Sequence, residues 1–222
     1  HLSRKFFHII SGTFFAYLLG SAFLTRFQSA LLLICLMSIL LPFELLRFRY
    51  ARLNEFIFRV YGPLMRKSER NAPSGQLYYL LGLGWAIFFL PKVIALQAIL
   101  TLAWMDPIAA LFGVRYGKKT WNSFFKVFFV GSRTLSISLG AKTVEGSAAG
   151  FLAAFLAGVF AWTGYWAAVP MSDGQGLWWP SPLQVFLFSA MGAFAAMVAE
   201  AWPSQWDDNV NIPFWSGLLV WA

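Results

Sequence analysis

Charged residues are scarce in this chain. They make up 12% of its 222 residues, about half of the share that is usual for a soluble domain. Apolar residues take their place, since 59% of the chain is hydrophobic and 19% is aromatic. Long stretches with almost no charge recur along the whole sequence, which excludes a soluble globular fold. We therefore predict an all-α membrane protein, a polytopic helical bundle that forms one domain.

Cysteine is nearly absent as well. The single Cys35 lies in an apolar run. This context predicts a packing residue and excludes a disulfide framework or a cysteine metal site.

Seven hydrophobic segments are expected to form the membrane helices. They span 6–24, 27–46, 76–91, 93–112, 147–169, 183–202 and 213–222, and the last is short for a crossing, which needs about 20 residues. Of the 17 lysines and arginines, only Arg26 and Lys92 fall outside the N-terminus and the loops 47–74 and 113–146. By the positive-inside rule, these regions and loop 203–212 are predicted to be cytoplasmic.

The net charge of +8 follows from the basic loops, so no nucleic-acid partner is predicted. Four arginines of the first loop are interpreted as orientation signals that also attract anionic lipid headgroups: Arg47, Arg49, Arg52 and Arg59. Residues 53–65 have apolar side chains at helical spacing and predict an amphipathic helix in the cytoplasmic interface, broken near Gly62-Pro63. This helix either anchors the surface or borders the entry path of a lipid.

An acidic residue stands inside the fourth segment. Asp106 is expensive to place in a membrane and indicates function. Because Asp-Pro is typical of a helix start, a break in the helix is expected at Asp106-Pro107. The small residues Gly113 and Gly117 follow on the same helical face, where either another helix or a ligand packs closely.

The end of this stretch is basic. Gly117-Lys118-Lys119 offers backbone and cations to phosphates. Taken alone, it is more typical of a helix C-terminus whose cations match the helix dipole.

The motif KTVEGSAAG (142–150) opens the next segment. Thr143 or Ser147 is expected to cap the helix, and Glu145 favours its positive end. Lys142 beside a helix N-terminus is a candidate anion site. Gly146 begins a stripe of small residues that continues at 150, 154 and 158 and predicts a helix-packing face.

Further polar residues lie at the predicted cytoplasmic ends of other segments. Glu200 closes a stripe of small residues, and Asp207-Asp208 offers hard oxygen ligands that suit Mg²⁺, or forms a solvated turn before Pro213. At the N-terminus, Arg4, Lys5 and His8 cluster on one helical side, either as a binding site or as cations that reach the interface. Cations and acids at one membrane face are what phosphoryl transfer needs.

In this order, the motifs RKxxH, LMRKSE, DPxAxxxGxxxGKK, KTxEGSxAG and DDNxxIP resemble the CTP-dependent lipid kinases, which include dolichol, phytol and yeast-type diacylglycerol kinases and are related to phosphatidate cytidylyltransferases. The matches run from residue 4 to residue 213. The resemblance implies a single CTP-transferase-like domain over 1–222, with the nucleotide held by loop 113–146. It implies transfer of the CTP γ-phosphate to a lipid hydroxyl, with CTP as donor and Mg²⁺ or another divalent cation as cofactor.

The resemblance and the residue chemistry together give a candidate site. The catalytic candidates are Asp106, Lys142 and Glu145, and the proton acceptor is left open between Asp106 and Glu145. The nucleotide-binding candidates are Arg4, Lys5, His8, Gly113, Gly117, Lys118, Lys119, Thr143, Gly146 and Ser147. The metal candidates are Asp106, Glu200, Asp207 and Asp208.

Residues 120–140 separate two of these motifs by more than the family pattern leads us to expect. The alternation in TLSISLGAK predicts a strand there, and a hairpin that covers the nucleotide.

Two alternative functions are open. A phosphatidate cytidylyltransferase making CDP-diacylglycerol shares the nucleotide and the metal, although the DDNVNIP stretch favours the kinase. A transporter places its polar groups near the bilayer midplane, and here they gather at one face. The lipid alcohol, diacylglycerol or a polyisoprenoid, is not predicted, and neither is the oligomeric state.

Overall fold

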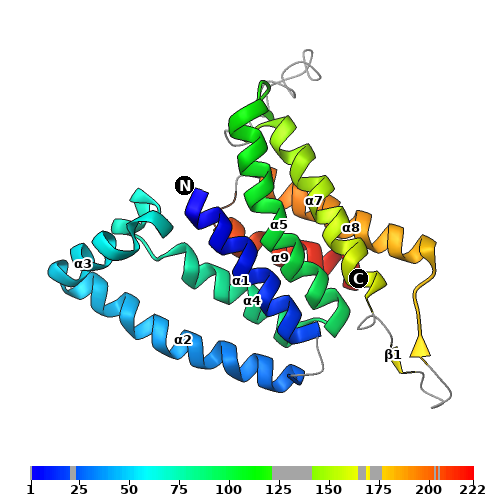
Figure 1. The fold of residues 1–222 in the computed structure, drawn as a ribbon, viewed down its shortest axis with the longest axis horizontal. Coiled ribbons are helices and arrows are strands. Elements are labelled where there is room, and N and C mark those ends of the chain that lie inside the picture. The colour runs from blue at the N-terminus through cyan, green and yellow to red at the C-terminus, as the bar shows by residue number, and fades with distance from the viewer. Residues whose placement is uncertain are drawn as a thin grey trace, which may run out of the picture.

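The chain folds into a bundle of helices (Figure 1). The computed structural model describes residues 2–20, 24–121, 142–164, 169–170, 177–202, 204 and 206–222. The elements are α1 (Leu2–Gly20), α2 (Arg26–Arg49), α3 (Ala51–Tyr61), the 3₁₀ helices η1 (Gly62–Leu64) and η2 (Lys67–Arg70), α4 (Gly75–Phe89), α5 (Lys92–Tyr116), α7 (Val144–Thr163), the strands β1 (Val169–Pro170) and β2 (Leu177–Trp178), α8 (Pro182–Ala201) and α9 (Asp208–Trp221). The two strands, of two residues each, pair antiparallel. The other described elements are all helical, which confirms the predicted helical class.

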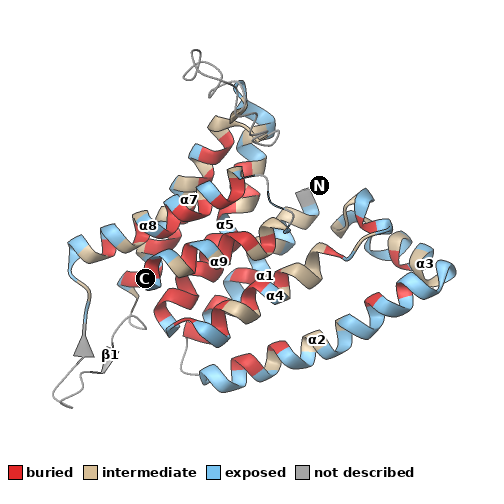
Figure 2. Ribbon diagram, turned by 180° about the vertical axis from the view of Figure 1, so that it is seen from behind, coloured by how far each residue is buried: buried red, intermediate tan, exposed pale blue. Residues whose placement is uncertain are grey.

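Helix α5 is the centre of the bundle, with α1, α7, α8 and α9 packed around it. In the most apolar stretch of α5, 78% of the residues are buried, compared with 22% in the corresponding stretch of α2. Figure 2 shows the same contrast, with buried residues concentrated on α5 and exposed ones along α2. Since α2 has the highest mean hydropathy of the long helices, it is suited to face lipid.

The position of α2 corrects one expectation. Cys35 is exposed on this helix, so its prediction as a packing residue was wrong. The helix touches the rest of the fold along few positions, and Cys35 is not one of them.

Four of the described helices, α2, α5, α7 and α8, are long and apolar enough to cross a membrane, and α4 is apolar but shorter. Each predicted segment contains a helix, but seven crossings are not confirmed. The segment predicted to run to residue 169 ends as a helix at Thr163, because Gly164 caps it. Val169 belongs to β1 instead.

The stripe of small residues on α7 is confirmed as a packing face. A Cβ atom added to Gly150 would lie 2.9 Å from the Cβ of Ala109 in α5, and one added to Gly158 would lie 2.9 Å from the Cβ of Ser189 in α8. Only small residues let the three helices approach this closely.

The expected break at Asp106-Pro107 was wrong. Helix α5 runs without interruption from Lys92 to Tyr116, with Pro107 inside it. A proline removes one backbone hydrogen bond, and inside a membrane bundle the neighbouring helices tolerate this loss. Asp106 is therefore a residue of a continuous helix and not a cap.

Helix α3 confirms the predicted amphipathic helix and its end at Gly62-Pro63, where η1 follows. Phe56 and Val60 expose their apolar side chains, while Ile57 is buried. This pattern suits a helix at a membrane surface, and that location remains a prediction.

Arg47 corrects the interpretation of the basic loop as surface charge. Its side chain is fully buried, and it donates to Glu44 Oε2 at 2.7 Å. It also donates to the backbone oxygens of Glu69 at 2.6 Å and Ala72 at 2.9 Å. Arg47 thus ties the end of α2 to the segment between η2 and α4, and no lipid headgroup reaches it.

Replacing Arg47 with methionine is expected to destabilise the protein by about 3–5 kcal/mol, because Glu44 is left buried without its cation. The thermal unfolding midpoint in detergent measures this loss. Arg49→Met serves as the control, because Arg49 is exposed and lies only two residues after Arg47. Equal midpoints for the two variants would contradict the buried role of Arg47. The double variant Glu44→Met/Arg47→Met should recover part of the loss.

Candidate active site

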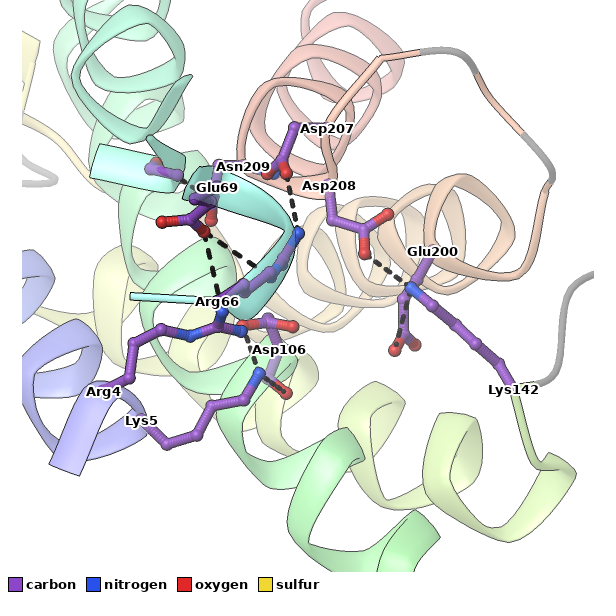
Figure 3. Close-up of polar contacts among 11 residues, drawn as sticks. Arg4, Lys5, Arg66, Glu69, Asp106, Lys142, Glu200, Asp207, Asp208 and Asn209 are labelled. Atoms are coloured by element: carbon purple, nitrogen blue, oxygen red, sulfur yellow. Dashed lines mark hydrogen bonds and ion pairs between the residues drawn. The ribbon is translucent and has the colours of Figure 1, made fainter. Parts of the chain in front are cut away.

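Polar side chains from α1, from α5, from the start of α7, from the end of α8 and from the start of α9 meet at one end of the bundle (Figure 3). The Nζ atom of Lys5 in α1 donates to Asp106 Oδ2 in α5 at 2.7 Å and to the Asp106 backbone oxygen at 3.3 Å. The Nζ atom of Lys142 lies 2.7 Å from Asp208 Oδ2 and 3.5 Å from Glu200 Oε1. Residues far apart in sequence thus form two neighbouring ion-pair groups.

Capping interactions at the starts of α7 and α9 fix the positions of Lys142 and Asp208, which belong to the second ion-pair group. Thr143 caps α7 by accepting the backbone N–H of Gly146 at 3.2 Å, which confirms one of its two expected caps and fixes Lys142 just before the helix. Asp207 caps α9 by accepting the N–H of Asn209 at 3.0 Å. Asp208 therefore lies in the first turn of a helix, and the alternative of a solvated turn before Pro213 was wrong.

The two groups act on one another. Burial alone lowers the pKa of Lys142, but the carboxylates of Asp208 and Glu200, with a smaller contribution from Asp106, raise the pKa above its ordinary value. Lys142 is therefore held as a cation. Burial raises the pKa of Asp208, and Lys142 opposes that shift. Asp106 thus lies within electrostatic reach of the Lys142 loop, as the kinase hypothesis requires.

The predicted metal ligands are paired with cations. Among the residues that the structure describes, no three His, Cys, Asp or Glu side chains gather as a ready metal site. Glu200 and Asp208 both face Lys142, and within the described ranges the buried Glu200 Oε2 has no hydrogen-bond partner. Mg²⁺ commonly takes one or two carboxylates together with substrate phosphates, so this pair fits such an ion.

Asp207 has a different environment. Its Oδ2 accepts from Arg66 Nη1 at 3.0 Å, and its Oδ1 accepts from Asn209. Both oxygens thus have protein partners, and its role as a metal ligand remains a prediction.

The small residues expected at the nucleotide lie in a contact between helices. A Cβ atom on Gly113 would lie 2.9 Å from Thr143 Oγ1, and one on Gly146 would lie 2.7 Å from the backbone oxygen of Ala109. Gly117, the residue that caps α5, also faces Thr143. Of the two expectations for this face, the structure supports close packing of another helix.

The remaining predicted residues lie around this contact. Lys118 and Lys119 are exposed after the end of α5, and within the described ranges no ion pair involves them. Glu145 accepts the backbone N–H of Lys119 at 3.3 Å, and Ser147 accepts from the indole nitrogen of Trp121 at 3.0 Å. The predicted strand in TLSISLGAK falls mostly on 122–141, outside the described residues.

A cavity opens beside Asp106. Its walls come from α1, η1, η2, α4 and α9, and it is lined by residues that include Arg4, His8, Arg66, Glu69, Tyr79 and Asn209. The ring of His8 lies tilted against that of Tyr79, with the ring centroids 4.5 Å apart. Arg66 and Glu69 were not among the predicted site residues. The LMRKSE motif of the resemblance contains both, and it was the signal that could have found them.

Comparison with known proteins gives the class. The CTP-dependent diacylglycerol kinase 1 of Schizosaccharomyces pombe is 30% identical, over 80% of this chain and 73% of the relative. The enzyme of the same name from Saccharomyces cerevisiae is 31% identical, over 99% of this chain and 72% of the relative. The chain belongs to the CTP-dependent diacylglycerol kinase family.

A third relative of the same name, from Eremothecium gossypii, is 32% identical over 80% of this chain and 53% of its own length. No family model and no solved structure matches. Membership of the diacylglycerol kinase family confirms the resemblance to CTP-dependent lipid kinases. These relatives carry the name of the diacylglycerol enzyme and not of the dolichol or phytol kinases.

The contact between α5 and α7 is expected to be essential to the site, because it fixes Lys142 relative to Asp106. Gly146→Ala puts a Cβ atom 3.0 Å from the Cα of Gly113 and should cost about 1–3 kcal/mol of stability. The thermal midpoint and the kinase rate should both fall. Gly84→Ala, where a Cβ meets nothing within 4 Å, is the control, and a Gly146→Ala protein indistinguishable from it would refute this account.

Proposed function

We propose that this protein transfers the γ-phosphate of CTP to the hydroxyl group of diacylglycerol, giving CDP and the corresponding lipid phosphate. Family membership, at 30–31% identity over most of the chain, is the observation that carries this reaction. The hydroxyl oxygen forms the new bond to the γ-phosphorus, the bond from that phosphorus to CDP breaks, and the hydroxyl proton passes to a base.

Asp106 is the base that the geometry favours. Its carboxylate lies in the wall of the cavity, whereas Glu145 is engaged by the backbone of Lys119 away from the cavity. Lys5, at 2.7 Å from Asp106, is placed to receive a phosphate oxygen close to that base. Catalysis of this kind consists mainly of positioning and charge neutralisation.

Lys142, Glu200 and Asp208 form the second part of the proposed site. The two carboxylates would hold Mg²⁺, which when bound neutralises charge on the phosphates. Lys142 then becomes free to contact the phosphates as a cation. Lys118, Lys119, Thr143 and Ser147 remain predicted nucleotide contacts at the edge of this group.

We place the N-terminus and the site on the cytoplasmic side. The distribution of lysine and arginine supports this orientation, and CTP is available there. A diacylglycerol molecule would reach the site from the bilayer. The family relation supports kinase chemistry over nucleotidyl transfer and over transport.

Purified protein with CTP, Mg²⁺ and diacylglycerol is expected to release CDP and no pyrophosphate. Asp106→Asn should lower kcat about 10²–10⁴-fold, because the variant keeps the shape of the base but cannot accept the proton. Chromatography of labelled products follows both results. Glu55→Gln, on an exposed carboxylate, should leave the rate unchanged, and release of pyrophosphate would identify a cytidylyltransferase instead.

Removal of divalent metal with EDTA is expected to abolish the activity, and Mg²⁺ should restore it. Glu200→Gln should raise the Mg²⁺ concentration needed for half-maximal rate at least about tenfold, because one of two proposed ligands is lost. Rate measured against free Mg²⁺ for this variant and for Glu55→Gln tests the assignment. An unchanged Mg²⁺ requirement would remove Glu200 from the metal site.

A further inference from the structure

Arg4 has an unusual environment for a partly buried arginine. It lines the cavity beside Asp106, and in the described part of the chain its guanidinium makes no hydrogen bond. Its contact with an anion is a long one, 4.0 Å from Nη1 to Glu69 Oε1. Five N–H donors in a fixed geometry are thus left available beside the proposed base.

Arg66 approaches the same carboxylate from the other side. Its Nε lies 3.9 Å from Glu69 Oε1, while its Nη1 is held by Asp207 at 3.0 Å. Glu69 therefore stands between two guanidinium groups and hydrogen-bonds to neither, since both distances exceed the range of a hydrogen bond. Figure 3 shows the two arginines converging on this carboxylate.

Stability does not explain this arrangement. The side chain of Glu69 is 7% exposed, and a buried ion pair compensates its desolvation only when hydrogen bonds satisfy the groups. Two cations that share one anion without such bonds are better matched to a ligand with more charge and more oxygen atoms. A phosphate group has both, and arginine binds it through paired N–H donors.

We infer that Arg4 and Arg66 form a subsite for the terminal phosphates of CTP, and that Glu69 occupies this subsite in the ligand-free protein. The inference rests on the proposed function. Binding of the phosphate displaces the carboxylate from between the arginines, while Asp207 keeps Arg66 in place. Gly75 at the start of α4 leaves room beside the carboxylate, because a Cβ there would lie 3.2 Å from Glu69 Oε1.

The neighbouring cations do not share this position. Arg66 lines the cavity, whereas Lys67 and Arg70 of η2 are exposed. Arg70 pairs with the exposed Glu55 at 3.5 Å. Arg70 thus provides a matched control from the same segment.

The test compares Arg66→Gln, Arg66→Lys, Glu69→Gln and Arg70→Gln, each checked for its thermal midpoint. Arg66→Gln should raise KM for CTP about ten- to a hundredfold, because this is the loss of affinity expected when hydrogen bonds to a charged group are removed. Its kcat should stay within about twofold of the parent value. Arg66→Lys should recover part of the affinity. Glu69→Gln should lower KM severalfold, because the competing carboxylate is gone, and Arg70→Gln should match the parent.

Inorganic triphosphate as a competitive inhibitor gives a second readout, and its binding constant should move with KM in each variant. An unchanged KM in Arg66→Gln, or a fall in kcat alone, overturns the subsite while the proposed function stands. Glu69→Gln that weakens CTP as much as Arg66→Gln also overturns it, because Glu69 would then only position Arg66.

If the parent protein shows no kinase activity, the proposed function fails. Stabilisation of the parent by inorganic triphosphate against heat then decides the subsite separately. Loss of this stabilisation in Arg66→Gln supports the subsite, and its persistence in that variant refutes it.

Discussion

A carboxylate in the central helix has to be neutralised, and the site is built around that requirement. Asp106 belongs to α5, which other helices surround, and an unpaired carboxylate in such a place is costly. Lys5 supplies the cation at 2.7 Å. This contact sets the start of α1 beside the middle of α5, and it brings Arg4 and His8 to the same end of the bundle.

The same balance of charge extends through the rest of the site. Lys142 is matched by Asp208 and Glu200, and Arg66 is matched by Asp207. Phosphoryl transfer from a nucleotide brings both signs of charge, the phosphates and the metal. In the ligand-free protein the cationic side chains of the site pair with its carboxylates. In the proposed reaction, binding of substrate would exchange partners between charges that are already in position.

The sequence predicted those features that depend on a residue and its immediate neighbours. Apolar runs placed a helix in every expected segment. The small residues at 146, 150 and 158 predicted a packing face because small side chains on one helical face are enough to let a neighbouring helix approach closely. The break at Pro107 was wrong because the effect of a proline depends on which helices surround it. Arg47 was misjudged because counting charges by loop ignores the backbone oxygens at 69 and 72 that fold back onto it.

The site residues also fall into those that the sequence predicted and those that only the folded structure reveals. Asp106, Lys142, Glu200 and Asp208 could be proposed because acids and bases at the ends of apolar segments stand out against their surroundings. Arg66 and Glu69 lie in a loop rich in charge, where nothing local distinguishes the charged residues that line the cavity from those that face solvent. Their role depends on Arg4 and Asp207, both far away in the chain, and only the folded structure brings these together.

The cavity lies where two parts of the fold meet. One wall comes from α1, α4, α5 and α9, which belong to the packed bundle, and the other comes from η1 and η2, which follow the exposed helices α2 and α3. Polar contacts hold the second wall in place, through Arg47 to the backbone at 69 and 72 and through Arg66 to Asp207. A group that binds Arg4 and Arg66 at once therefore spans the join and adds an attraction between the two parts.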